Sequence, residues 1–461
     1  MSSKRQKTQL LLAFAAEGRD EFPMAADGGS ELPVAKREAQ SPTRRDSLME
    51  EVCQRDNLWQ ALKRVQANKG APGVDGMTVH KLPKHLKRHW PKIREQLLAG
   101  TYRPQPVKRV EIPKPDGGVR KLGIPTVLDR FIQQAVLQVL QASWDQSFSK
   151  HSYGFRPRRS AHQAVAQAQA YIAEGYGYTV DIDLEKFFDR VNHDMLMGRV
   201  AKRVEDTRVL KLIRAFLNAG VMETGLVSPS EEGTPQGGPL SPLLSNLMLD
   251  DLDQELERRE LRFVRYADDC NIYVRSRRAG ERVMQSITHF ITGKLKLKVN
   301  ELKSAVARPA ERKFLGFSFT SGRQPKRRVA PKSLLRFKKR VRELTKRNRG
   351  VSLERMVAQL ARYLAGWRGY FGFCQTPSVL EGLDSWIRRR LRCFQWKQWR
   401  RGTTRFAELR KRGVGKDLAA QTAGSPRGLW HISRSPALSI ALPGAYFDSL
   451  GLPKLNETRH V

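Results

Sequence analysis

Two adjacent carboxylates, Asp268 and Asp269, lie between two apolar runs in the stretch RFVRYADDCNIYV, residues 262–274. The alternation of apolar residues predicts two short strands, with the acids at a tight hairpin turn. Neighbouring carboxylates repel each other and are costly to desolvate, so a divalent cation would stabilise a pair held this way. A solvated turn is the plainer alternative for an isolated Asp-Asp pair.

A second acidic segment, YTVDIDLEKFF, spans residues 178–188 and begins as a strand. Asp181 and Asp183 are two residues apart and therefore share one face. Either acid could complete a metal site with the hairpin. Between the two acidic segments, GTPQGGPLSP predicts a loop of close backbone approach before a buried helix, or an ordinary helix entrance.

Basic residues occur at two further candidate sites. The segment PVKRVEIPKPDGGVRKLGIP predicts a hairpin with strands at 107–112 and 119–124, and Lys114 and Arg120 flank its turn. Such a tip could close over a triphosphate or be a solvated loop. The segment SYGFRPRR, residues 152–159, joins aromatic rings to guanidinium groups, which suits a single-stranded nucleic acid backbone or an ordinary surface loop.

The composition narrows the class of partner. The chain has 461 residues, enough for about three domains, and a net charge of +38. Such an excess indicates a polyanion, most simply nucleic acid; a membrane surface is the weaker alternative. The sequence has no apolar run long enough to cross a bilayer and no clear signal peptide. Its four dispersed cysteines indicate neither a disulfide framework nor a zinc site and fit a reducing compartment.

The elements that must surround these candidates are mostly helical. Apolar residues at helical spacing predict a helix over residues 129–143 and three amphipathic helices over 334–344, 353–364 and 380–394. The last three form a predicted bundle with one face in a core and the other towards phosphates. Most of the bundle's aromatic rings are expected in that core, with base stacking as the alternative.

The chain resembles the reverse transcriptase and maturase proteins of bacterial group II introns over about residues 55–450. The resemblance depends on the order of the motifs NKGAPGVDG, RKLGIP, SYGFRPRRSAH, DIDLEKFFDRVNHD, GTPQGGPLSPLLSN, YADD, FLGF and GWRGYFGF. It implies an α+β fold, a right-hand polymerase followed by an α-helical thumb. The expected parts are a flexible leader (1–48), fingers and palm (49–325), thumb or maturase (326–400) and a basic C-terminal element, possibly DNA-binding (401–461).

The resemblance also assigns roles to residues. The catalytic and metal-binding carboxylates are Asp183, Asp268 and Asp269, with Asp183 favoured over Asp181 because an aromatic residue follows it five positions on. The expected nucleotide-binding residues are Lys114, Arg120, Phe188, Gln236 and Lys303. The expected template and RNA contacts are Tyr153, Arg156, Arg158, Arg159, Arg368, Arg388 and Arg389. The expected cofactor is a pair of Mg²⁺ ions, with Mn²⁺ as a substitute.

The implied function is RNA-directed DNA synthesis combined with intron splicing and mobility. The implied partners are group II intron RNA, an RNA template with a DNA primer, dNTPs and target DNA, with no membrane. The implied location is the bacterial cytoplasm, at the nucleoid during mobility. No CxxC pair follows the thumb, so we expect no endonuclease domain and a primer supplied in another way. A domesticated RNA-binding maturase and a defence-associated reverse transcriptase without an active intron are the alternatives.

Overall fold

The computed structural model describes residues 47–113, 119–223, 226–228, 233 and 237–456, without the side chains of residues 120, 223 and 226–228. The chain divides into two compact units. The first combines residues 1–164 with 180–306, and the second combines 165–179 with 307–461. The predicted leader lies outside the described residues except at its last positions. The predicted mixture of helices and strands is confirmed.

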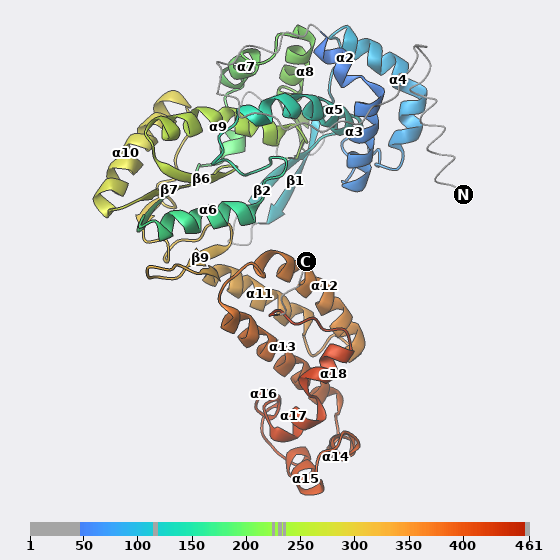
Figure 1. Ribbon diagram of the computed structural model, residues 1–461. Helices are drawn as coiled ribbons and strands as arrows, with labels where there is room; N and C mark the ends of the chain where they lie inside the picture. Colours follow the sequence, from blue (N-terminus) through green and yellow to red (C-terminus); the bar gives the residue numbers. More distant parts are fainter. Residues whose placement is uncertain (1–46, 114–118, 224–225, 229–232, 234–236, 457–461) are drawn as a thin grey trace, which may run out of the picture. The chain divides into compact units, whose positions relative to one another are not determined.

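The predicted acidic hairpin is part of a four-stranded sheet in the order β6-β7-β3-β8. These strands are β6 (Arg262–Tyr266), β7 (Asp269–Val274), β3 (Tyr178–Ile182) and β8 (Ala305–Ala307). Strand β7 is buried along almost its whole length, because helix α9 packs on β6 and helix α10 packs on β7 (Figure 1). The hairpin strands are therefore held from more than one side.

The predicted basic hairpin also forms, with β1 (Val107–Pro113) antiparallel to β2 (Val119–Ile124). Two short strands that the sequence did not suggest, β4 (Val221–Glu223) and β5 (Leu226–Ser228), extend this sheet to the order β2-β1-β4-β5. Strand β4 runs parallel to β1, starting with Val107 opposite Val221. Segments more than a hundred residues apart thus meet in one sheet.

Helices of the first unit surround these sheets. Helix α5 (Val127–Trp144) extends the helix predicted over 129–143 by a few residues because Thr126 caps it: its hydroxyl accepts a hydrogen bond from the backbone N–H of Asp129. Most of its apolar residues are buried, and each large apolar side chain among them, such as Phe131 or Ile132, stabilises the fold by roughly 1.5–3 kcal/mol. The other helices that belong wholly to this unit are α2 (Leu48–Val52), α3 (Arg55–Ala67), α4 (Leu82–Leu98), η1 (Asp145–Ser147), η2 (Phe187–Asp189), α7 (His193–Ala201), α8 (Thr207–Leu217), α9 (Ser241–Arg258) and α10 (Arg277–Lys294).

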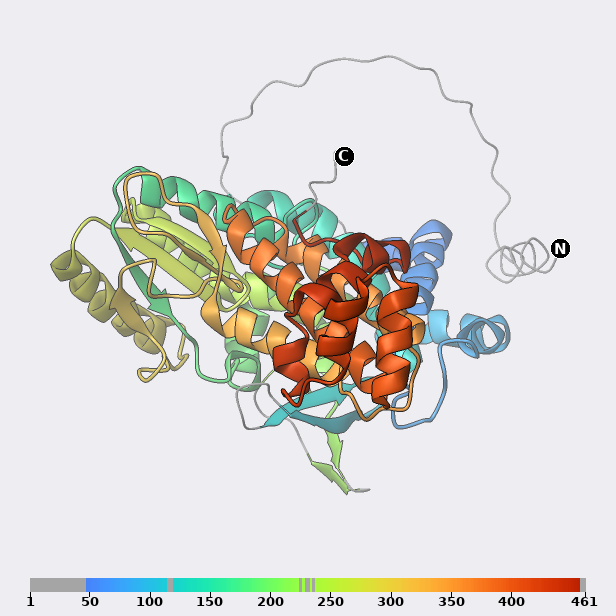
Figure 2. The same cartoon turned by 90° about the horizontal axis from the view of Figure 1, so that it is seen from below.

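The three predicted amphipathic helices are confirmed in the second unit as α11 (Pro331–Leu344), α12 (Leu353–Phe371) and α13 (Pro377–Gln398). A set of smaller helices packs beside α13, and Figures 1 and 2 show them in red. They are α14 (Gly402–Lys411), α15 (Lys416–Ala423), α16 (Leu429–Ile432), α17 (Pro436–Ala441) and α18 (Gly444–Ser449). One hydrophobic core extends from Val329 to Leu455, so the segments predicted as 326–400 and 401–461 share one packed unit.

The second unit also includes a segment from the middle of the chain, which contains most of α6 (Ala161–Ala173). Gln169 on this helix donates from Nε2 to the carbonyl of Pro325 at 2.6 Å and to Oε1 of Gln375 at 2.7 Å. Arg327 donates to Oε1 of Gln169 at 2.6 Å. Arg327 belongs to β10 (Arg327–Val329), which pairs with β9 (Phe317–Phe319). Helix α6 is thus fastened to residues more than 150 positions further along the chain.

Candidate active site

The acidic turn is a two-residue hairpin. Tyr266 pairs with Asp269, so Ala267 and Asp268 form the turn itself. Ala267 has a φ of 57°, in the left-handed region that costs a residue with a Cβ roughly 1 kcal/mol or more. Asp268 and Asp269 are both half-buried. The structure therefore places two neighbouring carboxylates at the turn of the β6–β7 hairpin, on a backbone that the surrounding residues must hold in shape.

Asp183 is the first residue after β3, the strand next to β7 in the sheet. Its backbone N–H donates to the hydroxyl of Ser304 at 3.0 Å, and its carbonyl accepts from the N–H of Asn300 at 2.8 Å. These two bonds fix Asp183 against the turn that carries Lys303. The Lys303 ammonium lies 3.7 Å from Oδ2 of Asp183. The structure thus brings together Asp183 and Lys303, residues separated by 120 positions.

The donor set suits a hard divalent cation, because it consists of carboxylates at the ends of neighbouring strands. Asp268 and Asp269 are half-buried, and the Asp183 side chain is 41% exposed. The ammonium of Lys303 beside Asp183 shows that positive charge is favourable there. No group of three or more His, Cys, Asp or Glu side chains is already arranged to hold a metal ion within the described residues. The residues therefore fit the ion by their chemistry, and the structure gives no coordination geometry.

Phe188 lies in the short helix η2, which begins after Lys186 in a left-handed conformation (φ 49°). Its ring packs edge-on to Phe187, with the ring centres 5.2 Å apart. Gly233 approaches this helix closely, since a Cβ there would lie only 2.9 Å from the carbonyl oxygen of Phe188. Gly233 has a φ of 92°, so both its conformation and this contact require glycine.

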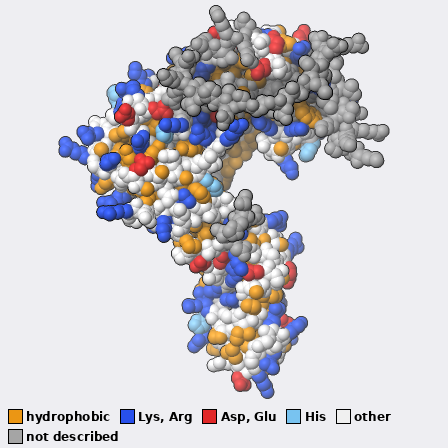
Figure 3. All heavy atoms as spheres, viewed as in Figure 1, with side chains coloured by type: hydrophobic (Ala, Val, Ile, Leu, Met, Phe, Trp, Pro, Cys, Tyr) orange, Lys and Arg blue, Asp and Glu red, His pale blue; other side chains and the backbone are white. Residues whose placement is uncertain are grey.

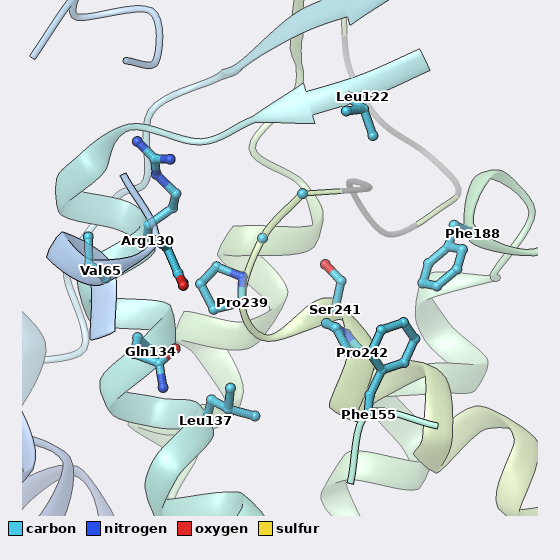
Figure 4. Close-up of a pocket in the computed structure, with 13 residues that line it drawn as sticks. Val65, Leu122, Arg130, Gln134, Leu137, Phe155, Phe188, Pro239, Ser241 and Pro242 are labelled. Atoms are coloured by element: carbon cyan, nitrogen blue, oxygen red, sulfur yellow. The ribbon is translucent and has the colours of Figure 1, made fainter. Parts of the chain in front are cut away.

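An open pocket of about 480 Å³ lies beside Phe188. Figure 4 shows Phe188 and Phe155 on one side of it and Arg130 and Gln134, both from α5, on the other. Gly237 and Gly238 also line the pocket. Burial lowers the pKa of Arg130 from its usual high value. Rings, amides and a guanidinium therefore meet around a space open to solvent.

Two of the predicted template contacts are buried inside their own loop. Tyr153 is 6% exposed, and burial raises the pKa of its phenol. Arg156 donates from Nε to Oδ1 of Asp145 at 2.7 Å and from Nη1 to the carbonyls of Ser149 and Ser152 at 2.5 and 3.0 Å. Arg156 therefore stabilises the conformation of its own loop. Its contact with a template stays a prediction.

The next two arginines are more accessible. Arg158 is exposed, while Arg159 lies with its guanidinium 5.3 Å from the centre of the Tyr153 ring and donates to the carbonyl of Lys150 at 3.2 Å. Phe155, between them and Tyr153 in the sequence, is 49% exposed. An exposed ring and guanidinium groups thus share this loop, which is the combination that the sequence suggested for nucleic acid.

Two of the RNA contacts predicted in the second unit, Arg388 and Arg389, have side-chain partners within the protein. Arg388 is paired with Asp448 at 2.6 Å and with Asp384 at 3.4 Å. Arg389 stacks on Trp430, with its guanidinium carbon 3.8 Å from the ring centre. Arg368 lies in the last turn of α12, where its carbonyl accepts from the N–H that ends the helix. Figure 3 shows Lys and Arg side chains outnumbering acidic ones on the visible face of this unit.

The remaining predicted nucleotide contacts fall on residues that the structure does not describe in full. Lys114 and Gln236 lie outside the described residues. Arg120 pairs through its backbone with Ile112 in the basic hairpin, and its side chain is not described. Their roles stay predictions.

Sequence reasoning missed the residues that support the acidic turn. Gly154 lies against it: a Cβ at this position would be 2.2 Å from the backbone nitrogen of Ala267. Arg265, one residue before Tyr266, is completely buried and bonds to the turn. The position of Gly154 within the aromatic motif SYGF could have indicated a close backbone contact. Nothing in the sequence distinguishes Arg265 from the other residues among the 84 Lys and Arg.

Paired carboxylates in a hairpin turn lie in the same sheet as a third carboxylate with a lysine beside it, and an open pocket also belongs to this unit. Comparisons with known proteins show the class to which the chain belongs. A family model described as reverse transcriptase (RNA-dependent DNA polymerase) matches residues 112–319. A model described as the group II intron maturase-specific domain matches residues 334–413. The chain belongs to the group II intron reverse transcriptase/maturase family. It is an RNA-directed DNA polymerase. Polymerases of that family use divalent metal ions and act on nucleic acids.

Among similar proteins, protein YkfC of Escherichia coli strain K12 is 34% identical over 299 residues, covering 56% of this chain and 78% of YkfC. The group II intron-encoded protein LtrA of Lactococcus lactis subsp. cremoris is 35% identical over 218 residues, covering 46% of this chain and 35% of LtrA. The chain therefore spans about a third of LtrA. A solved structure titled "Partial Cas6-RT-Cas1--Cas2 complex" matches at 25% identity with a TM-score of 0.35, covering 54% of this chain and 43% of that one.

Proposed function

We propose that Asp183, Asp268 and Asp269 hold two Mg²⁺ ions and that the protein copies intron RNA into DNA at this site. In the reaction, the 3′-hydroxyl of a DNA primer loses its proton to solvent and its oxygen bonds to the α-phosphorus of a dNTP. The bond from that phosphorus to the oxygen bridging to the β-phosphate breaks, and pyrophosphate leaves. The support is that Asp183 directly follows β3 and Asp269 begins β7, two neighbouring strands of one sheet, with Asp268 in the adjoining turn.

The carboxylates supply hard oxygen ligands that bind and orient the ions. The ions, when bound, supply charge stabilisation for the attacking and leaving oxygens. In this proposal Lys303, whose ammonium lies 3.7 Å from Asp183, binds a phosphate of the incoming nucleotide. Lys114 and Arg120 hold the triphosphate in this proposal, and Gln236 lies beside the nucleotide. Such positioning is the main contribution that a protein makes to phosphoryl transfer.

Phe188 is the proposed selector of deoxynucleotides. Its ring lines the pocket and is backed by Phe187. A rigid ring beneath the sugar leaves no room for a 2′-hydroxyl, so ribonucleotides would be excluded. The exposed Phe155 and Arg158 suit contact with the template strand better than the buried Tyr153 and Arg156 do.

Primer extension on an RNA template tests the proposed site. Asp183→Ala, Asp268→Ala and Asp269→Ala should each abolish extension. The matched control is Asp251→Ala, which removes a carboxylate of α9 whose side chain is 44% exposed and pairs with Arg199. Extension at the wild-type rate by the first three variants would refute the assignment.

The second proposed activity is assistance of intron splicing, supported by the maturase match and the basic surface of the helical unit. High positive charge alone gives only non-specific affinity, so binding must be measured at near-physiological salt. Splicing of the intron RNA with and without the protein tests this activity, and equal rates would exclude it. In this proposal the protein works in the bacterial cytoplasm and meets target DNA at the nucleoid during intron mobility.

A further inference from the structure

Arg265 on β6 is a charged side chain with no solvent exposure. It donates from Nε to Oδ1 of Asp253 at 2.7 Å and from Nη2 to Oδ2 of the same carboxylate at 2.5 Å. Although burial opposes it, the Asp253 carboxylate raises the pKa of Arg265 above its usual value, so the guanidinium stays charged. Asp253 lies on α9, so this two-pronged pair joins the hairpin to the helix behind it.

The same guanidinium also reaches the catalytic turn. Its Nη1 donates to the carbonyl of Ala267 at 2.9 Å and to Oδ1 of Asn246 at 3.0 Å. Ala267 is the turn residue with the left-handed backbone, directly before Asp268. A charged donor fixed on one side by Asp253 therefore holds the carbonyl of the residue that precedes the first acid.

A second brace comes from the loop containing Gly154. Asn246 donates from Nδ2 to the carbonyl of Gly154 at 2.9 Å, and Gly154 packs against the nitrogen of Ala267. The backbone of Arg265 also bonds to this loop, donating to the carbonyl of His151 and accepting from the N–H of Tyr153, both at 2.9 Å. The turn is thus held between α9 and the loop.

A buried ion pair is weak evidence for stabilisation, because desolvation of its two charges offsets their attraction. Its directional bonds nevertheless define one position of the turn. We propose that Arg265 is a positioning residue, and that with Asp253 and Asn246 it fixes the place of Asp268 and Asp269 for metal binding. This inference rests on the proposed function, because it takes these two aspartates as the metal ligands.

The test compares Arg265→Lys and Asn246→Ala with the control Arg203→Lys. A lysine keeps the charge but cannot reproduce the planar fork of four bonds. Asn246→Ala leaves the Arg265–Asp253 pair in place, so it remains informative if the first variant does not fold. Arg203 pairs with Asp250 at 2.7 Å, also on α9, and that pair is similarly buried. The guanidinium of Arg203 donates to Asp250 and to the hydroxyl of Ser147 instead of the turn, so its variant controls for disruption of a buried ion pair.

The readouts are Mn²⁺ binding without nucleotide by electron paramagnetic resonance, kcat and KM for dNTP in primer extension, and the unfolding midpoint. We expect Arg265→Lys and Asn246→Ala to weaken Mn²⁺ binding several-fold and to lower kcat about 10- to 100-fold, with KM little changed. Arg203→Lys should lower the unfolding midpoint while leaving Mn²⁺ binding and kcat unchanged.

Two results would overturn the inference in distinguishable ways. If Asp268→Ala abolishes extension while Arg265→Lys and Asn246→Ala keep the Mn²⁺ affinity and kcat of the control, the positioning role alone is wrong. If Asp268→Ala extends primers normally, the proposed metal site is wrong, and the positioning role is wrong with it.

Discussion

Replacing Gly154 by alanine should damage catalysis by displacing the backbone of the acidic turn. The new Cβ would lie 2.2 Å from the nitrogen of Ala267 and 2.9 Å from the carbonyl carbon of Tyr266. Both neighbours are backbone atoms, so no flexible side chain can move aside. Ordinary van der Waals contact begins near 3.4 Å, so loop and turn must separate by about 1 Å.

This separation has two measurable consequences. Overpacking of this kind costs about 1–3 kcal/mol of unfolding free energy. A displacement of about 1 Å at Asp268 lowers kcat by on the order of 100-fold. The assay is single-nucleotide extension of a DNA primer on an RNA template, with thermal unfolding and far-ultraviolet circular dichroism measured on the same samples.

Gly198→Ala is the matched control, because Gly198 lies inside α7 and a Cβ there would meet nothing within 4 Å. It should stabilise the protein by roughly 0.5–1 kcal/mol, since alanine favours the helix, and leave kcat unchanged. A folded Gly154→Ala variant with wild-type kcat would contradict the reasoning, because the turn would then tolerate the displacement or accommodate the methyl group without moving.

Three further predictions concern charge. Lys303→Met should slow nucleotide incorporation in single-turnover kinetics. It should change the unfolding free energy by less than about 1 kcal/mol, because the side chains of Lys303 and Asp183 are 66% and 41% exposed. An unchanged incorporation rate would argue against a role of Lys303 at the nucleotide. Burial raises the pKa of Asp250 from 3.8 to about 6. Between these two pH values the carboxyl stays protonated in the folded state but is ionised in the unfolded state, so the free energy of unfolding falls as pH rises from about 4 through 6. Asp250→Asn should remove that contribution, which unfolding at pH 4.5 and pH 7 measures; an unchanged pH dependence would count against it. Removing two exposed charges of α11 with Lys332→Gln and Lys339→Gln should weaken RNA binding and reduce its salt dependence. The slope of log K against log salt concentration should fall in magnitude by about 0.7 for each single-strand phosphate that is no longer neutralised. An identical slope in filter binding would exclude a role for these lysines in binding phosphate.

Local patterns in the sequence were enough to predict the hairpins and the long helices. The alternation around Asp268 and Asp269 and the helical spacing along α11, α12 and α13 each depend on residues close together in the chain. Such patterns determine which face of a helix or strand is apolar. Burial of that face then favours the helix or the strand whose period matches the pattern.

Contacts between distant segments could not be predicted in the same way. The pairing of β4 with β1 joins short segments without a distinctive period. The burial of Arg265 depends on Asp253 and Asn246, which become its partners only once α9 lies behind β6. For the same reason Arg156 looked like a nucleic acid contact, since only the folded loop brings Asp145 to it.

The place of helix α6 has a consequence for how the protein is made and divided. A ribosome synthesises Gln169 more than 150 residues before its partners Pro325 and Arg327. The second unit therefore cannot complete its packing until the polymerase segment between them has been translated. A maturase fragment that starts at residue 326 would lack this helix, and the amide of Gln375 would lose its hydrogen bond from Gln169. An independent helical fragment would need residues 165–179 supplied as a separate peptide or joined through a linker.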